Sequence, residues 1–250
     1  MPTAVISDIH ANASALKTVL ADIESREITR IICLGDIVGY GPDPLECVDL
    51  VRQKCAWSLM GNHDFGVLYE PTNFNPGAES AAFWTRAQFE SDPDRERRNR
   101  RWQYLGSMPT RMGNDRFVCF HASPRRPINE YVFPDDVYNA PQKISALFDR
   151  IDKACFLGHT HVPGVFLPDP DFYSPEEISY RHQITDELVM VNVGSVGQPR
   201  DHDPRASYAI IHEDRVQFVR IPYDIDSTAK KIKSIGPLND WLGDRLYEGR

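Results

Sequence analysis

Five of the eight histidines in this chain stand in short polar clusters, and each cluster follows an apolar run. Where several apolar strands end in carboxylate, amide and imidazole groups, the fold can gather those groups at one sheet edge, as a metal centre requires. The sequence therefore predicts a metalloenzyme. The clusters are Asp8-Ile9-His10, Gly35-Asp36, Gly61-Asn62-His63-Asp64, His121 and Gly158-His159-Thr160-His161.

The earliest clusters supply donors for a first ion. Side chains alternate along a strand, so Asp8 and His10 are expected on the same side where their strand meets its loop. Asp36 offers two carboxylate oxygens after the next strand, and a carboxylate between two divalent ions offsets their repulsion. We therefore expect Asp8 and His10 to bind one ion and Asp36 to bridge two.

The later clusters supply donors for a second ion. Asn62 offers an amide oxygen, His121 and His159 offer imidazole nitrogens, and His161 can reach back to the first ion. Singly, such residues have ordinary explanations, because a lone Asp or Asn caps helices and turns and a lone His is usually a satisfied polar side chain. Their joint occurrence in this order favours metal binding.

Apolar runs and helical spacing predict the elements that position these donors. Three strand-and-helix units in the first half favour a largely parallel sheet with helices outside, and the later strands favour antiparallel pairing. Residues 65–76 and 168–175 are expected to be loops, and residues 123–136 irregular. The predicted strands are 4–6, 30–34, 56–60, 117–120, 154–157, 188–193, 207–211 and 215–221, and the predicted helices are 13–23, 45–53, 78–90, 94–105 and 142–152.

Composition sets the class of protein. With 250 residues, 41% of them hydrophobic, and donors spread from Asp8 to His161, the chain is expected to form a single domain over residues 1–250. A net charge of -8 argues against binding duplex nucleic acid. No stretch reaches the roughly 18 apolar residues of a membrane span, and no secretory leader is seen, so we expect no membrane partner and a cytoplasmic location.

The cysteines favour a reducing compartment. Their number, five, is odd and their spacing is irregular, with no Cys-x-x-Cys pair for a thiolate zinc site. Cys33, Cys119 and Cys155 lie within apolar runs and are expected to be small buried hydrophobic residues rather than disulfide partners.

Taken together, the ordered clusters resemble the calcineurin-like metallophosphoesterase superfamily, over about residues 4–221. The resemblance implies an α/β fold, a four-layer αββα sandwich of two mixed β-sheets flanked by helices, with a dimetal site at one rim. It assigns the first ion to Asp8, His10, Asp36 and His161, and the second to Asp36, Asn62, His121 and His159.

Further segments are similar to the small bacterial and archaeal phosphodiesterase branch of that superfamily: residues 35–44, His121-Ala122-Ser123-Pro124 and residues 192–200. The Ser/Thr protein phosphatases and their dinucleoside-tetraphosphatase relatives follow the bridging Asp with an Asp-Arg-Gly signature. This chain has Val38-Gly39-Tyr40-Gly41 instead, which argues against protein-phosphatase activity.

The expected reaction is hydrolysis of phosphodiesters, with phosphomonoesters or nucleotides as further substrates. Two divalent ions bring four positive charges and Asp8 and Asp36 remove two, so the surplus attracts a phosphoryl group. Ions about 3.5–4 Å apart also lower the pKa of a bridging water, and the resulting hydroxide attacks phosphorus in line. Carboxylate, amide and imidazole donors suit manganese, iron, zinc or nickel.

Other side chains are candidates for catalysis and substrate binding. The resemblance places His63 at the phosphate, as general acid or transition-state stabiliser. Asp64 is expected to orient the His63 ring, with a turn-forming Asp as the alternative. Arg200 and Arg125 are candidate phosphate ligands, with surface salt bridges as the alternative.

A basic stretch, Arg95 to Arg101, could cover an anionic substrate, but its interleaved acids favour a solvated helix face. Trp102 and Tyr104 could stack on a nucleobase, although core packing is the better explanation.

Two other functions stay open at this point. One is a dinucleoside polyphosphate hydrolase, and the other, of a different class, is a non-catalytic scaffold on the same fold. The complete donor set and the presence of His63 favour an enzyme over a scaffold. The sequence leaves the substrate, the metal and the oligomeric state open.

Overall fold

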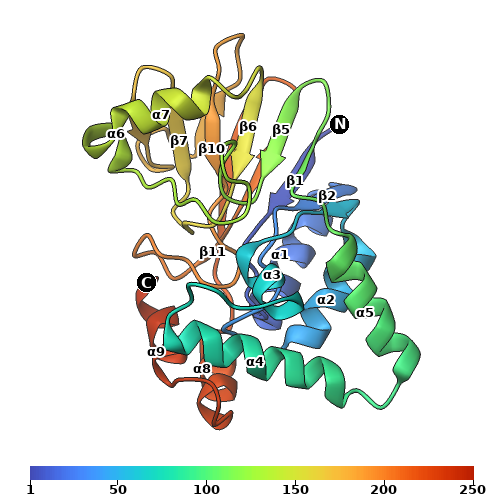
Figure 1. The fold of residues 1–250 in the computed structure, drawn as a ribbon. Helices are drawn as coiled ribbons and strands as arrows, with labels where there is room; N and C mark the ends of the chain where they lie inside the picture. The colour runs from blue at the N-terminus through green and yellow to red at the C-terminus, as the bar shows by residue number, and fades with distance from the viewer.

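Successive side chains of a strand pack into different hydrophobic cores, one between the two sheets and one beneath the helices. In a computed structural model that describes residues 1–250, Val5 of β1 (Thr3–Ile6) packs between two sheets, whereas Ala4 and Ile6 pack beneath helices. In β5 (Phe117–Phe120), Phe117 faces the same inter-sheet core. This alternation produces two stacked sheets, each covered by helices on its outer face (Figure 1).

Each sheet is mixed and has six strands. In both sheets, the polar loops that hold the predicted donors follow parallel strands. The first sheet has the order β3 (Trp57–Ser58), β2 (Arg30–Cys33), β1, β11 (Ala206–Ile211), β12 (Arg215–Ile221) and β9 (Arg181–Gln183), with β1 to β3 parallel. The second has the order β4 (Arg111–Gly113), β5, β6 (Ala154–Leu157), β10 (Met190–Asn192), β7 (Gly164–Leu167) and β8 (Asp171–Tyr173), with β5, β6 and β10 parallel.

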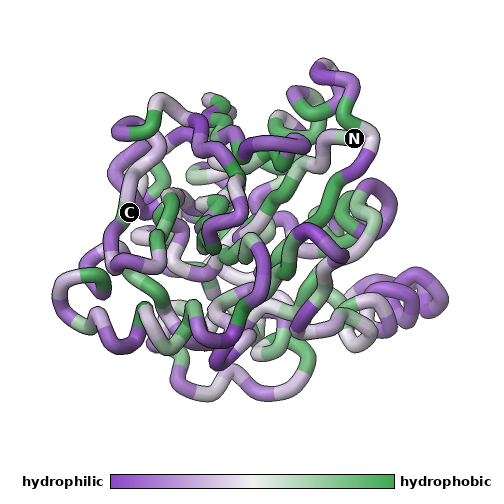
Figure 2. The backbone as a smooth tube through the Cα atoms, turned by 90° about the horizontal axis from the view of Figure 1, so that it is seen from above, coloured by the Kyte–Doolittle hydropathy of each residue, from purple (hydrophilic) through white to green (hydrophobic).

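The helices form the two outer layers. Two short helices, α6 (Asp136–Asn139) and α7 (Pro141–Phe148), cover the second sheet at the top of Figure 1. Hydrophobic segments gather inside the molecule and hydrophilic ones lie mostly outside, as Figure 2 shows. The first sheet is covered by α1 (Ala13–Ser25), α2 (Pro44–Lys54), α3 (Asn62–Leu68), α4 (Pro76–Ser91) and α5 (Arg95–Ser107). Helices α8 (Ile225–Ser234) and α9 (Trp241–Glu248) pack on each other and on α4, in a further hydrophobic cluster.

The predicted αββα sandwich is confirmed, and so are the parallel start and the buried strands. Three local predictions are wrong. The expected loop 65–76 begins inside α3, which runs to Leu68, and the expected loop 168–175 contains β8. The helix predicted over 142–152 ends at Phe148. None of the helices has the length and apolarity needed to cross a lipid bilayer.

Candidate metal centre

The carboxyl ends of parallel strands from both sheets meet at one rim, and each strand is followed by a polar loop. The structure brings all seven predicted donors together there. Asp8 and His10 follow β1, Asp36 follows β2, Asn62 opens α3 after β3, His121 follows β5, and His159 and His161 follow β6.

Most of the donors share an unusual backbone conformation. The φ angle is positive at Asp8 (53°), His10 (48°), Asp36 (51°), His159 (68°) and His161 (62°). L-residues other than glycine enter this left-handed region at a cost in free energy, so such conformations cluster at functional sites. Asp8 and His10 lie together as predicted, but the predicted reason is wrong. Strand β1 ends at Ile6, so the alternation of side chains along a strand does not extend to Asp8 and His10.

Hydrogen bonds between the loops hold Asp8 in this conformation. Its backbone N–H donates to the Gly35 carbonyl at 3.0 Å, and its own carbonyl accepts from Ser195 Oγ at 2.7 Å. Its carboxylate Oδ2 accepts the backbone N–H of His159 at 3.0 Å. Asp8 therefore joins loops from both sheets.

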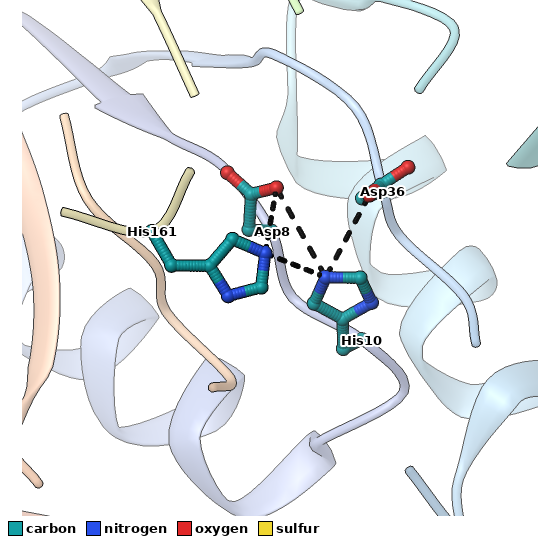
Figure 3. Close-up of side chains that lie close together, drawn as sticks. All are labelled: Asp8, His10, Asp36 and His161. Carbon is teal, nitrogen blue, oxygen red and sulfur yellow. Dashed lines mark hydrogen bonds and ion pairs between the residues drawn. The ribbon is translucent and has the colours of Figure 1, made fainter. Parts of the chain in front are cut away.

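The donor atoms form two groups that share one residue. Asp8, His10, Asp36 and His161 offer atoms within 4.8 Å of one another (Figure 3). Asp36, His121 and His159 form a second group with the same spacing. Within the first group, His161 Nε2 lies 3.3 Å from Asp8 Oδ1. All the residues of both groups are buried.

Asp36 stands between the two groups through a single oxygen. Its Oδ2 lies 3.6 Å from His10 Nε2 and 3.4 Å from His121 Nε2. Its Oδ1 accepts the backbone N–H of His63 at 2.8 Å, which fixes the plane of the carboxylate. Asn62 Oδ1 lies 3.3 Å from His121 Nε2 and so belongs beside the second group.

Three imidazole rings are oriented by backbone carbonyls. The Nδ1 atoms of His10, His121 and His161 lie 3.2, 2.9 and 2.6 Å from carbonyl oxygens. A carbonyl only accepts, so each Nδ1 carries a proton, and in the neutral ring the lone pair is on the Nε2 atom that faces the cluster. Proteins commonly orient metal-binding histidines in this way.

These lone pairs fit divalent cations. The Nε2 atoms of His10 and His161 face each other at 3.0 Å, and burial lowers the pKa of both rings, which disfavours a proton shared between them. The Nε2 atom of His159 is buried without any hydrogen-bond partner, and burial lowers the pKa of this ring to about 3. Cations between these nitrogens would satisfy all three.

His121 differs from the other rings because of its carboxylate neighbour. Burial favours its neutral form, but the charge and hydrogen bond of Asp36 outweigh burial and raise the pKa of His121 to about 9. Asp8 and Asp36 leave two negative charges in a buried site, which cations would offset.

His63 lies beside the cluster and packs among rings. Its ring centroid is 4.4 Å from Tyr40, 4.6 Å from Phe74 and 4.8 Å from His10. Burial lowers the pKa of His63 to about 4, so the ring is neutral.

Asp64 contacts backbone amides rather than the His63 ring. Its Oδ1 accepts N–H groups of Ile37 (2.9 Å) and Val38 (3.3 Å), and its Oδ2 accepts that of Gly61 (3.1 Å). Burial and the neighbouring Asp36 raise the pKa of Asp64 to about 7. A role in orienting His63 stays a prediction, with no hydrogen bond between the two side chains in its support.

The two candidate arginines lie in different surroundings. Arg200 has no carboxylate partner, donates to Gln198 Oε1 at 2.8 Å, and lies over the Tyr40 ring at 5.8 Å. Its positive charge contributes to the lowered pKa of His161 and of His10. Arg125 instead forms an ion pair with Glu130.

The basic stretch Arg95 to Arg101 lies on α5, and arginines of this stretch form ion pairs with carboxylates outside this helix. Arg97 and Arg101 pair with Asp92, and Arg101 also pairs with Asp49. Trp102 packs against Phe89 at 4.7 Å, as predicted for a core residue. Tyr104 is also partly buried against this core. The stretch contributes no residue to the cavity beside the cluster.

A cavity with a volume of about 490 Å³ lies beside the donor cluster, and it was not predicted from the sequence. Asn62, His63 and His159 form part of its lining, together with Tyr131 and Arg126. Tyr131 stacks on the ring of His159 at 4.0 Å. No periodicity or motif marked these exposed loop residues, although Arg126 directly follows the arginine that was predicted.

The fold and the donor set place the chain in a known class of proteins. The family model of the calcineurin-like phosphoesterase superfamily domain matches residues 1–215, and the chain belongs to this superfamily. Membership implies a metal-dependent phosphoester hydrolase with two metal ions.

Particular relatives cover the whole chain. The uncharacterized protein MJ0912 of Methanocaldococcus jannaschii is 39% identical, over 99% of this chain and 98% of that protein. A metallophosphoesterase from Sphaerobacter thermophilus is 37% identical, with a TM-score of 0.82 over 100% of both chains. A symmetrical bis(5'-nucleosyl)-tetraphosphatase of Erwinia tasmaniensis is 35% identical over 71 residues, or 27% of this chain and 26% of that protein.

Proposed function

We propose that this protein is a dimetal phosphodiesterase that also accepts some phosphomonoesters or nucleotides. The observation that carries the proposal is the position of Asp36, whose Oδ2 lies within 3.6 Å of one histidine in each donor group. One carboxylate oxygen between two sets of imidazoles is the arrangement that a shared ligand of two cations requires.

In this proposal the donors divide as the resemblance implies. Two divalent ions held there would polarise a phosphoryl oxygen and lower the pKa of a bound water. Asp36 is the shared ligand. The other ligands are Asp8, His10 and His161 for one ion and Asn62, His121 and His159 for the other.

Neighbouring side chains act directly on the substrate. His63 lines the cavity and, as a neutral ring, donates a hydrogen bond that stabilises charge on the leaving oxygen. Arg200 has no carboxylate partner and one buried unpaired Nε, so its guanidinium is free to bind a phosphoryl oxygen. Arg125, paired with Glu130, reaches a phosphate only by giving up that ion pair.

A dinucleoside polyphosphate hydrolase is the second candidate. It is favoured by the similarity over 71 residues to a bis(5'-nucleosyl)-tetraphosphatase. Hydrolysis rates of dinucleoside polyphosphates and aryl phosphodiesters, measured side by side, would distinguish the two functions.

Two substitutions at the cluster test the proposal. Asp36→Asn and His121→Ala are each expected to abolish hydrolysis of bis(p-nitrophenyl) phosphate and to lower the metal content found by elemental analysis. His212→Ala is the matched control, because this ring lies outside the cluster and contacts Gln217. Full activity in either cluster variant would contradict the proposal.

A further inference from the structure

The cavity opens directly onto the metal centre. Its volume of about 490 Å³ falls within the range of about 300–1,000 Å³ that is usual for small-molecule sites. Because Asn62, His63 and His159 belong to its lining, a molecule in the cavity lies beside the donors and beside His63. The cavity is therefore placed to hold the organic part of a phosphoester while the phosphoryl group reaches the donors.

Two separate segments form the walls, and each presents an aromatic ring. Phe65 comes from α3 and is 37% exposed, and Tyr131 comes from the loop after β5 and is 42% exposed. Phe74 and Tyr40 also line the cavity and pack against His63. Such rings provide flat surfaces on which a planar group can stack.

Polar groups between the rings are free to bind a ligand. Asn73 and Asn129 line the cavity, and neither side chain makes a hydrogen bond within the protein. Arg126 makes only a backbone hydrogen bond, to Ser123 Oγ at 2.9 Å, whereas the adjacent Arg125 is paired with Glu130. Amide and guanidinium groups match the donors and acceptors on the edge of a heteroaromatic base.

We propose that this cavity binds the nucleoside part of a nucleoside phosphoester. The base stacks against both Phe65 and Tyr131, its edge bonds to Asn73, Asn129 or Arg126, and the ester oxygen faces His63. The free amides and the guanidinium disfavour a purely apolar occupant, and a sugar phosphate has no planar ring for the aromatic walls. This assignment rests on the proposed function, because it places the phosphoryl group at the metal centre.

Binding of two related monophosphates tests the assignment. AMP and ribose 5-phosphate share the sugar and the phosphate, and only AMP carries a base. Calorimetric titration of the protein as purified, with its metal, is expected to show AMP binding about tenfold or more tighter, the effect of stacking one base on an aromatic side chain.

Variants of the walls locate the base. Phe65→Leu and Tyr131→Leu are expected to remove most of the preference for AMP and to leave binding of ribose 5-phosphate unchanged. Tyr138→Leu is the control, since Tyr138 is 76% exposed and lies outside the cavity lining. Because Tyr131 stacks on His159, metal content is measured for each variant. If the Tyr131→Leu variant has lost metal, the AMP preference of the Phe65→Leu variant alone decides the result.

The outcomes separate this assignment from the proposed function. Equal affinities of the wild-type protein for AMP and ribose 5-phosphate would overturn the assignment even if aryl phosphodiesters are hydrolysed. A preference for AMP that survives in the Phe65→Leu variant and in a metal-replete Tyr131→Leu variant would overturn it too. A preference that is lost in those variants, in a protein that hydrolyses no phosphoester, would support the cavity assignment and contradict the proposed function.

Discussion

Substitution of Asp64 by Asn distinguishes a role in the fold of the site from a role in orienting His63. Asp64 is fully buried and accepts three backbone N–H groups. The amides of Ile37 and Val38 belong to the loop after β2, and the amide of Gly61 precedes α3. The carboxylate therefore ties together the two loops that carry Asp36 and Asn62.

The size of the effect follows from this geometry. In Asp64→Asn the remaining oxygen can serve Ile37 and Val38, but the new NH₂ group faces the Gly61 N–H. One buried amide then loses its acceptor, which costs about 1–3 kcal/mol. At about 2–4 °C per kcal/mol for a chain of this size, the melting temperature falls by roughly 2–12 °C.

The assay is thermal unfolding of the metal-free protein, followed by circular dichroism, with metal content and kcat measured on the reconstituted variant. Asp186→Asn is the control, because Asp186 is exposed and makes no side-chain hydrogen bond. If Asp64 acted only through the His63 ring, kcat would fall and the melting temperature would stay the same. An unchanged melting temperature would therefore refute the reasoning.

Two further predictions concern His63 and Glu130. His63→Ala is expected to retain the metal, measured by elemental analysis, and to lower kcat by about 10²–10⁴-fold; loss of metal would identify His63 as a ligand instead. Burial raises the pKa of Glu130, but hydrogen bonds from Arg125 and Ser123 outweigh it and hold this pKa below its ordinary value of 4.5. Because the native pKa is depressed, Glu130 stabilises the fold above pH 4.5 and loses that contribution as pH falls through the native pKa. Urea unfolding of Glu130→Gln should show a deficit of up to about 1 kcal/mol at neutral pH that vanishes in acid, and a constant deficit would argue against this linkage.

The strands and the donor set were predictable because both leave a strong local signal. Runs such as Phe117 to Phe120 are buried along their whole length, and the polar residue that follows, His121, marks where the strand ends. Helix α3 was missed because it is short and contains Gly66, and its first residues were assigned to a loop motif. The closing helices α8 and α9 were not predicted, although each is amphipathic and buries one face, with Ala229 and Ile232 in α8 and Leu242 and Leu246 in α9.

The cavity could not be predicted, because neighbouring residues in its loop point to different places. Arg125 pairs with Glu130, whereas Arg126 lines the cavity. Tyr131 reaches the site only because the loop after β5 returns to the rim and stacks this ring on His159. These placements depend on the path of the loop in space, and residue type alone does not encode that path.

The backbone of the rim explains why glycine recurs beside the donors. A Cβ atom at Gly61 would collide with the Asp36 carboxylate, and one at Gly158 would collide with Ser7 and reach the Asp8 carboxylate. The two carboxylates are therefore confined by the backbone of neighbouring loops. Each donor in the left-handed region costs about 1–3 kcal/mol, which the hydrogen bonds between the loops must offset. The hydrogen bonds that join the loops, such as the one from the Asp8 N–H to the Gly35 carbonyl, therefore help to hold the donors in these conformations.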